Sequence, residues 1–125
     1  MKPEWVRRYL AHNKCGDVPL ALAIVQVESG FDELAVSPDA GSIGLCQMTQ
    51  PFFMQYNLRV PPNMVSWSNP FAQLDALMQF LYTQRDHTQQ KRALIYHYGH
   101  VPLIDDDDYW RKVVKYIDDE TLLGP

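Results

Sequence analysis

A run of ten residues, Val18 to Val27, is apolar on nearly every side and constrains the fold of this chain more than any other segment. A helix that is hydrophobic all round belongs inside a folded domain, and the Leu and Ala content of the run favours a helix. Glu28 follows at once and is itself followed by Ser29-Gly30. The sequence therefore carries one carboxyl group from a buried element into a turn.

Two physical effects act on Glu28 in that position. Withdrawal from water disfavours the charged form of a carboxyl group, and the C-terminal end of a helix carries partial negative charge, which opposes a carboxylate. Both effects favour a protonated Glu28 near neutral pH, which is what a general acid requires. The alternative is a solvated Glu that only closes the helix, and the position alone leaves both readings open.

Four short motifs follow one another along the chain: Glu28-Ser29-Gly30-Phe31, Ala35-Val36-Ser37, Gly44-Leu45-Cys46-Gln47-Met48 and Ile95-Tyr96-His97-Tyr98-Gly99. In this order they resemble the catalytic module of the soluble lytic transglycosylases, lysozyme-like enzymes that cleave bacterial peptidoglycan. That family reads Glu-Ser-x-Phe, Ala-x-Ser, Gly-Leu-Met-Gln and Ala-Tyr-Asn-Ala-Gly. Further matches are Asn69-Pro70-Phe71 and Tyr109-Trp110-Arg111-Lys112-Val113-Val114. The resemblance spans nearly the whole chain and implies one all-α, lysozyme-like domain over residues 1–125, with about six to eight helices and a substrate cleft.

The chain also departs from the family pattern. Cys46 stands where the family usually has Met, and His97 stands where it usually has Asn. The loop between Ser37 and Gly44 is one residue longer than usual. None of these differences removes Glu28, so they concern the shape of the sugar cleft, the substrate preference and the rate.

The resemblance implies a mechanism with a single carboxyl group. Glu28 would protonate the glycosidic oxygen and then, as a carboxylate, take the proton of the muramic acid C6 hydroxyl, leaving a 1,6-anhydro sugar. Tyr96 would orient the Glu28 carboxyl through its hydroxyl, and Gln47 would hydrogen-bond an N-acetyl group. The other expected substrate-binding residues are Ser29, Ser37, Thr49 and His97. The alternatives are local, because Ser37 before Pro38 suits a turn and Tyr96 can simply fill space.

Ordinary glycoside hydrolysis uses two carboxylates. The acids nearest to Glu28 in the sequence are Asp32, Glu33 and Asp39, and all three fall in a stretch from Asp32 to Ser42 that has the composition of an exposed loop. A hydrolytic, goose-type lysozyme on the same fold stays an open alternative. So do a non-catalytic wall-binding component of a phage tail or secretion apparatus and, more remotely, a chitin-directed enzyme.

Composition excludes several other classes. The net charge is −4 and no basic cluster exceeds Arg7-Arg8 or Arg111-Lys112, so the electrostatic signature of a nucleic-acid-binding protein is missing. The sequence contains neither an apolar stretch of membrane length nor a signal-peptide pattern. These features predict no nucleic-acid partner and no membrane insertion, and the resemblance implies that the partner is peptidoglycan glycan strands. A phage particle or a secretion machine is a further candidate partner, and we expect the protein to be a monomer. It would reach the cell wall through a phage particle, a holin or a specialised secretion machine, or as a domain of a longer protein.

The cysteine and histidine pattern predicts no metal, no cofactor and no disulfide. Cys15 and Cys46 do not form a Cys-x-x-Cys pair, and the four His residues lack a zinc-motif spacing. Cys46 could be a nucleophile with His97 as its base. We favour the alternative that Cys46 is a small buried apolar residue. The acids from Asp105 to Asp108 are interpreted as solvated residues before a helix rather than as metal ligands.

Turn residues and apolar periodicity predict helices and no strand. The longest helix begins at Ser68-Asn69-Pro70 and carries an apolar stripe that we expect in the core, made of Phe71, Leu74, Leu77, Met78 and Leu81. Pro61-Pro62-Asn63 is expected to break the chain. The other predicted helices are Pro3–Asn13, Val18–Ser29, a short one at Leu45–Gln47, Pro51–Tyr56, Lys91–Tyr98 and Asp107–Asp119.

Overall fold

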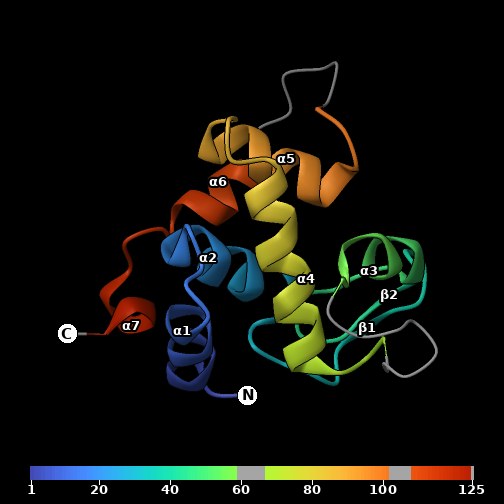
Figure 1. Ribbon diagram of the computed structural model, residues 1–125, viewed down its shortest axis with the longest axis horizontal. Coiled ribbons are helices and arrows are strands. Elements are labelled where there is room, and N and C mark those ends of the chain that lie inside the picture. Colours follow the sequence, from blue (N-terminus) through green and yellow to red (C-terminus); the bar gives the residue numbers. More distant parts are fainter. Residues whose placement is uncertain (59–66, 102–107, 125) are drawn as a thin grey trace.

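The computed structural model describes residues 1–58, 67–101 and 108–124. Within these ranges it contains seven helices and one short two-stranded sheet, which confirms the predicted all-α, lysozyme-like class (Figure 1). The predicted break at Pro61-Pro62-Asn63 and the acids Asp105 to Asp107 lie outside the described residues. The elements are α1 (Pro3–His12), α2 (Val18–Ser29), β1 (Val36–Ser37), β2 (Ser42–Ile43), α3 (Gln50–Tyr56), α4 (Pro70–Thr83), α5 (Gln89–Tyr98), α6 (Asp108–Val114) and α7 (Glu120–Leu123).

Helix α2 lies at the centre of the core and has the bounds that the sequence predicts. Six consecutive residues from Leu20 to Val25 are fully buried, and α2 contacts α1, α5, α6 and α7. The Asp17 side chain caps its first turn by accepting from the Leu20 amide, and Gly30, in the left-handed conformation, ends it. Each fully buried Leu or Ile contributes about 1.5–3 kcal/mol to folding, so this helix fixes where Glu28 can lie.

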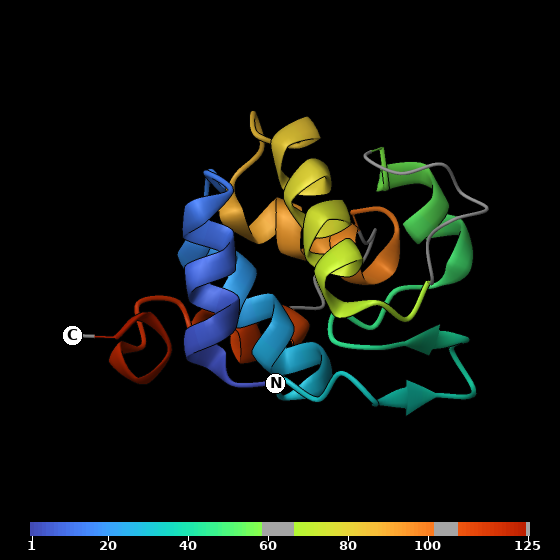
Figure 2. The same ribbon diagram turned by 60° about the horizontal axis from the view of Figure 1, so that its bottom comes forward.

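Helix α4 separates two parts of the molecule. In both ribbon views α1 and α2 lie on one side of α4, and α3 with the two strands lies on the other (Figures 1 and 2). Leu74, Leu77 and Leu81 of the predicted stripe are buried, as expected. Phe71 was expected in the core but is 45% exposed. It lies in the first turn of α4, where its ring contacts the Tyr9 ring with centroids 5.0 Å apart.

The segment between Val36 and Met48 differs from the prediction. Val36 and Ser37 pair with Ile43 and Ser42 in an antiparallel ladder where a loop was expected, and Leu45–Gln47 forms a turn instead of a short helix. Ile43 and Met48 exchange two backbone hydrogen bonds of 3.1 Å that close this turn. The ladder is too short to produce an alternating sequence pattern, so nothing in the sequence predicted it.

The buried side chain of Gln73 in α4 explains why this segment forms a turn. It accepts from the Cys46 amide at 2.9 Å and donates to the carbonyls of Ile43 and Trp67 at 3.0 and 2.8 Å. A Cβ atom at Gly44 would lie 2.5 Å from the Gln73 Nε2 atom, so a glycine is required at that close approach. These contacts from a distant helix replace the local hydrogen bonds of a helical turn.

The C-terminal helix is shorter than predicted. Helix α6 ends at Val114 rather than near Asp119, and a separate helix α7 begins at Glu120. Asp118 adopts a left-handed backbone conformation with φ of 64°, and the Asp119 side chain accepts from the Thr121 amide and caps α7. The chain therefore turns at Asp118, and α7 packs against α1.

Candidate active site

Glu28 lies in the last turn of α2 with a side chain that is only 12% exposed. Its carboxyl group borders a cavity of about 320 Å³. The other residues that line this cavity come from the segment 40–49, which contains β2 and the turn after it, from α3 and from the end of α5. They are Ala40, Ser42, Gln47, Met48, Thr49, Phe52, Tyr96, His97, Tyr98 and Gly99. The structure therefore brings Glu28 together with four of the six predicted substrate-binding residues.

Two aromatic side chains hold one oxygen of the Glu28 carboxyl group. The Tyr109 hydroxyl of α6 donates to Oε2 at 2.7 Å, and Nδ1 of His97 in α5 lies 3.1 Å from the same oxygen. The His97 and Tyr109 rings are stacked, with centroids 4.0 Å apart and planes only 10° from parallel. Among the described residues, the other oxygen, Oε1, has no hydrogen-bond partner.

The neutral groups around Glu28 are held neutral by their surroundings. Burial, and after it the nearby Glu28 carboxylate, raises the pKa of Tyr109 far above its ordinary value. Burial is likewise the first cause that raises the pKa of Tyr96. Both phenols therefore keep their protons near neutral pH and act as hydrogen-bond donors.

The expected hydrogen bond from Tyr96 to Glu28 is not present. The Tyr96 hydroxyl donates to the backbone carbonyl of Cys46 at 2.5 Å, and a phenol has one proton to donate. The Tyr96 ring packs edge-on against Phe52, with centroids 5.2 Å apart. Tyr96 therefore fastens the turn that carries Gln47 to α5, and Glu28 accepts its hydrogen bond from Tyr109 instead.

Gln47 lines the cavity, but its amide group already has protein partners. Its Nε2 donates to the carbonyls of Ala35 and Gly44, both at 3.0 Å, and its Oε1 accepts from the hydroxyls of Ser37 and Ser42 at 2.7 and 3.2 Å. Gln47 and Ser37 therefore brace the two strands against the turn. The hydrogen bond from Gln47 to an N-acetyl group stays a prediction.

Of the remaining predicted substrate-binding residues, some line the cavity and others do not. Ser37 and Ser29 are not among the residues that line the cavity. The Ser29 hydroxyl donates to the Leu45 carbonyl at 2.5 Å, which ties α2 to the turn. Thr49 lines the cavity and also caps α3 by accepting from the Phe52 amide. Polar cavity residues that the sequence reading did not assign are Ser42 and Tyr98.

The three acids considered as second carboxylates lie outside the cavity lining. Asp32 accepts from the Leu34 amide in an exposed turn at 2.9 Å. Glu33 binds the N-terminal ammonium group, and that hydrogen bond lowers the pKa of Glu33. Asp39 is exposed. Glu28 is thus the one acidic side chain among the described residues that border the cavity.

Comparison with known protein families agrees with this geometry. Residues 8–114 match the family described as "Transglycosylase SLT domain". The chain belongs to this family. Membership supports a peptidoglycan lytic transglycosylase activity in general, and hence action on the bacterial cell wall. Searches of curated proteins and of solved structures gave no significant match.

The Cys46 thiol of this SLT domain is unsuited to nucleophilic attack. Cys46 is fully buried, and burial, with a smaller contribution from the Glu28 carboxylate, raises the pKa of the thiol far above its ordinary value. A thiolate is the reactive form, so the structure favours Cys46 as a packed apolar residue. In the ranges that the structure describes, no cluster of three potential metal-ligating side chains is found, nor is there a helix long and apolar enough to cross a membrane.

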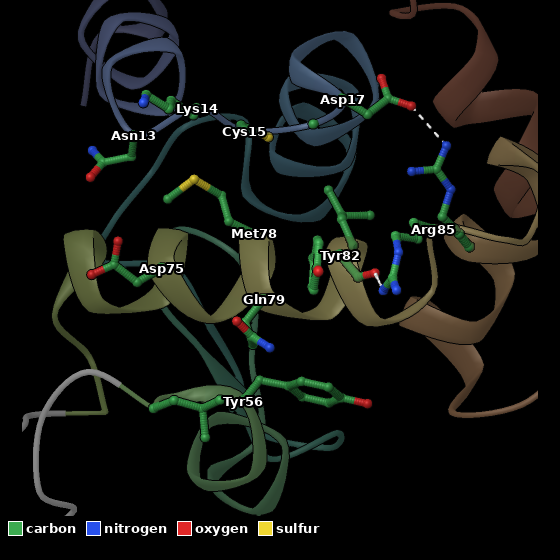
Figure 3. A pocket seen from close by; sticks show the side chains of 14 residues that line it. Asn13, Lys14, Cys15, Asp17, Tyr56, Asp75, Met78, Gln79, Tyr82 and Arg85 are labelled. Atoms are coloured by element: carbon green, nitrogen blue, oxygen red, sulfur yellow. Dashed lines mark hydrogen bonds and ion pairs between the residues drawn. The ribbon is translucent and has the colours of Figure 1, made fainter.

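A larger cavity of about 590 Å³ lies away from Glu28, along α4 and the connection between α1 and α2 (Figure 3). Its two acids already serve the fold of the SLT domain. Asp17 forms an ion pair with Arg92 at 2.8 Å and caps α2, and Asp75 accepts from the Tyr9 hydroxyl at 2.7 Å. Asp17 uses both of its carboxylate oxygens in such contacts with the Leu20 amide, Gln89 and Arg92.

Proposed function

We propose that this SLT domain cleaves the β-1,4 bond between N-acetylmuramic acid and N-acetylglucosamine in peptidoglycan and forms 1,6-anhydromuramic ends. The observation that carries the proposal is that Glu28 is the single carboxyl group on the described cavity lining. Tyr109 holds its Oε2, and no described residue pairs with its Oε1. Inverting and retaining glycosidases need a second carboxylate close to the scissile bond. A cavity with one carboxyl group suits a reaction in which the substrate supplies its own nucleophile.

In the first step Glu28 donates the proton on Oε1 to the glycosidic oxygen while the bond from that oxygen to the anomeric carbon breaks. The N-acetylglucosamine side leaves as an alcohol, and the muramic ring carries positive charge. Tyr109 keeps its hydrogen bond to Oε2 throughout and stabilises the carboxylate that forms. Such a bond to a charged group contributes about 1.5–3 kcal/mol.

In the second step the Glu28 carboxylate takes the proton of the muramic C6 hydroxyl, and the C6 oxygen bonds to the anomeric carbon. Glu28 is protonated again and no water is consumed. The partial enclosure of the carboxyl group, which is only 12% exposed, favours this route because it limits the water that competes with the C6 hydroxyl. Ser37 and Tyr96 hold the turn that carries Gln47 through hydrogen bonds to Gln47 and to the Cys46 carbonyl, and so fix this part of the cavity lining.

The experiment is digestion of purified peptidoglycan by the wild-type chain and by Glu28→Gln. A positioned general acid contributes a factor of about 10²–10⁴ to rate, so the variant should lose at least about 99% of the cleavage while binding peptidoglycan in a sedimentation assay. If the wild-type protein sediments with peptidoglycan but does not cleave it, the chain is a non-catalytic wall-binding component instead. Cleavage that survives in Glu28→Gln would exclude Glu28 as the acid.

A further inference from the structure

The larger cavity beside α4 has the size of a ligand site. Its volume of about 590 Å³ falls in the range of roughly 300–1,000 Å³ that is typical of such sites. Asp75, Met78, Gln79 and Tyr82 line it from one face of α4, between the connection from α1 to α2 and the end of α3 (Figure 3). A helix rises about 1.5 Å per residue, so this row is about 10 Å long, the length of about three residues of an extended peptide.

The cavity lining carries an excess of positive charge. Three basic side chains, Lys14, Arg85 and Arg92, line it together with two acidic ones, Asp17 and Asp75. Arg92 is paired with Asp17. Among the described residues, neither Lys14 nor Arg85 has an acidic partner. The whole chain has a net charge of −4, so this cavity is a local site that favours an anionic ligand.

The guanidinium group of Arg85 is held in place by Tyr82. Its Cζ atom lies 4.3 Å from the centre of the Tyr82 ring, a favourable position for a cation, and Nη1 donates to the Tyr82 carbonyl at 2.9 Å. That hydrogen bond uses one of the five N–H donors of a guanidinium group. The other donors can bind a carboxylate in the two-pronged geometry that arginine favours.

Lys14 lies in a backbone position that usually holds glycine. The Lys14 amide donates to the Ala11 carbonyl at 3.1 Å, and the next amide, of Cys15, donates to the Leu10 carbonyl at 2.9 Å. This is the Schellman pattern that ends many helices, and Lys14 adopts its left-handed conformation with φ of 60°. A residue with a side chain is less stable there than glycine. Stability of the helix end therefore does not explain a lysine at this position.

We propose that this cavity binds the stem peptides of peptidoglycan, which are the short peptides attached to muramic acid, with peptide carboxylates at Arg85 and Lys14. An inorganic anion would use only the basic groups. The lining also offers apolar surface at Leu58 and Met78 and an amide at Gln79, and a short acidic peptide uses all of these. The source of the ligand rests on the proposed function, because stem peptides carry free carboxyl groups on the polymer that the SLT family acts on.

The first test measures binding by isothermal titration calorimetry. The probe is the mixture of stem peptides that an amidase releases from purified peptidoglycan. Arg85→Gln should weaken binding by roughly fivefold or more, because a carboxylate loses a charge-assisted pair of hydrogen bonds at a partly solvated site. Arg8→Gln, at an exposed arginine outside the cavity lining, is the matched control and should bind as the wild type does. No binding by the wild-type chain, or equal binding by Arg85→Gln, would overturn the inference.

The second test uses Lys14→Gly, which removes the charge and places glycine in the left-handed position. Peptide binding should weaken by roughly twofold or more, while Tm stays the same or rises because glycine suits this conformation. This combination separates loss of the cation from damage to the fold. Unchanged peptide binding in Lys14→Gly would overturn the role of Lys14.

Released stem peptides contain no glycosidic bond, so their binding does not depend on cleavage. A chain that binds them without cleaving peptidoglycan would support this inference while the proposed function fails. Cleavage without peptide binding would overturn this inference alone. If a tetraglutamate peptide binds and stem peptides do not, the assignment to stem peptides is wrong and the cavity takes an acidic segment of a partner protein.

Discussion

The Tyr109 hydroxyl donates a 2.7 Å hydrogen bond to Oε2 of Glu28 across 81 positions of sequence. This bond joins the first turn of α6 to the last turn of α2, two helices that pack against each other. Tyr109 is only 4% exposed, so the packing of its ring in the core fixes where its hydroxyl oxygen lies. The orientation of the proposed acid, Glu28, thus depends on how α6 packs against α2.

Changing Tyr109 to Phe should slow peptidoglycan cleavage by roughly ten- to a hundredfold, because a hydrogen bond to a charged group contributes about 1.5–3 kcal/mol. The ring and its stacking on His97 remain in the variant. The measurement is kcat/KM on purified peptidoglycan, with Tyr82→Phe as a control at an exposed tyrosine. If kcat/KM of Tyr109→Phe is within twofold of the wild-type value, Tyr109 contributes packing only and its hydroxyl does not assist cleavage.

Changing Tyr96 to Phe should mainly reduce stability. The Cys46 carbonyl, which accepts the Tyr96 hydroxyl, would be left buried without a donor, at a cost of about 1–3 kcal/mol. Thermal unfolding should show a fall in Tm of several degrees, while the rate per folded molecule changes little. A rate loss as large as that of Tyr109→Phe, with Tm unchanged, would instead support a direct role of Tyr96 on Glu28.

Changing Gln73 to Ala should destabilise the fold by about 3 kcal/mol or more, because one amide and two carbonyl groups lose their partner in the interior. The turn that carries Gln47 would lose its anchor on α4. The free energy of unfolding from urea titration measures the effect. Gln79→Ala, on the same helix at a half-buried position, should cost much less, and equal losses would contradict this role for Gln73.

Changing Asp32, Glu33 and Asp39 to Ala one at a time should leave cleavage within about twofold of wild type, since none of them lines the cavity and surface substitutions rarely have larger effects. The rate and the ratio of anhydro to reducing ends are measured for each. If one of these changes costs as much as Glu28→Gln, that residue acts as a second carboxylate and the mechanism is of the lysozyme type.

The parts of the fold that follow local rules could be predicted from the sequence. Helix α2 has the predicted bounds because Asp17, Pro19 and Gly30 mark its ends and its apolar run leaves it no solvent face. The same segment predicted a carboxyl group, Glu28, that lies largely withdrawn from water at the end of α2. Its position beside Gln47, Tyr96 and His97 followed from the family resemblance.

The hydrogen-bond partners could not be predicted, because they depend on contacts between distant segments. Gln73 decides the conformation of Leu45–Gln47 from a position 27 residues beyond Cys46. The partner of Glu28 depends on the packing of α6, and both Tyr96 and Tyr109 had suitable hydroxyl groups. A signal for Tyr109 did exist, since a buried tyrosine usually finds a hydrogen-bond partner and Tyr109 opens the C-terminal motif.

The most direct test of the one-carboxylate mechanism is the mass of the muropeptides that the wild-type chain releases from purified peptidoglycan. Attack by the C6 hydroxyl yields 1,6-anhydromuramic ends, which are lighter by one water than the reducing ends left by hydrolysis. We predict that anhydro ends dominate and that both products disappear with Glu28→Gln. Products with mainly reducing ends would contradict this account and identify the chain as a hydrolytic lysozyme.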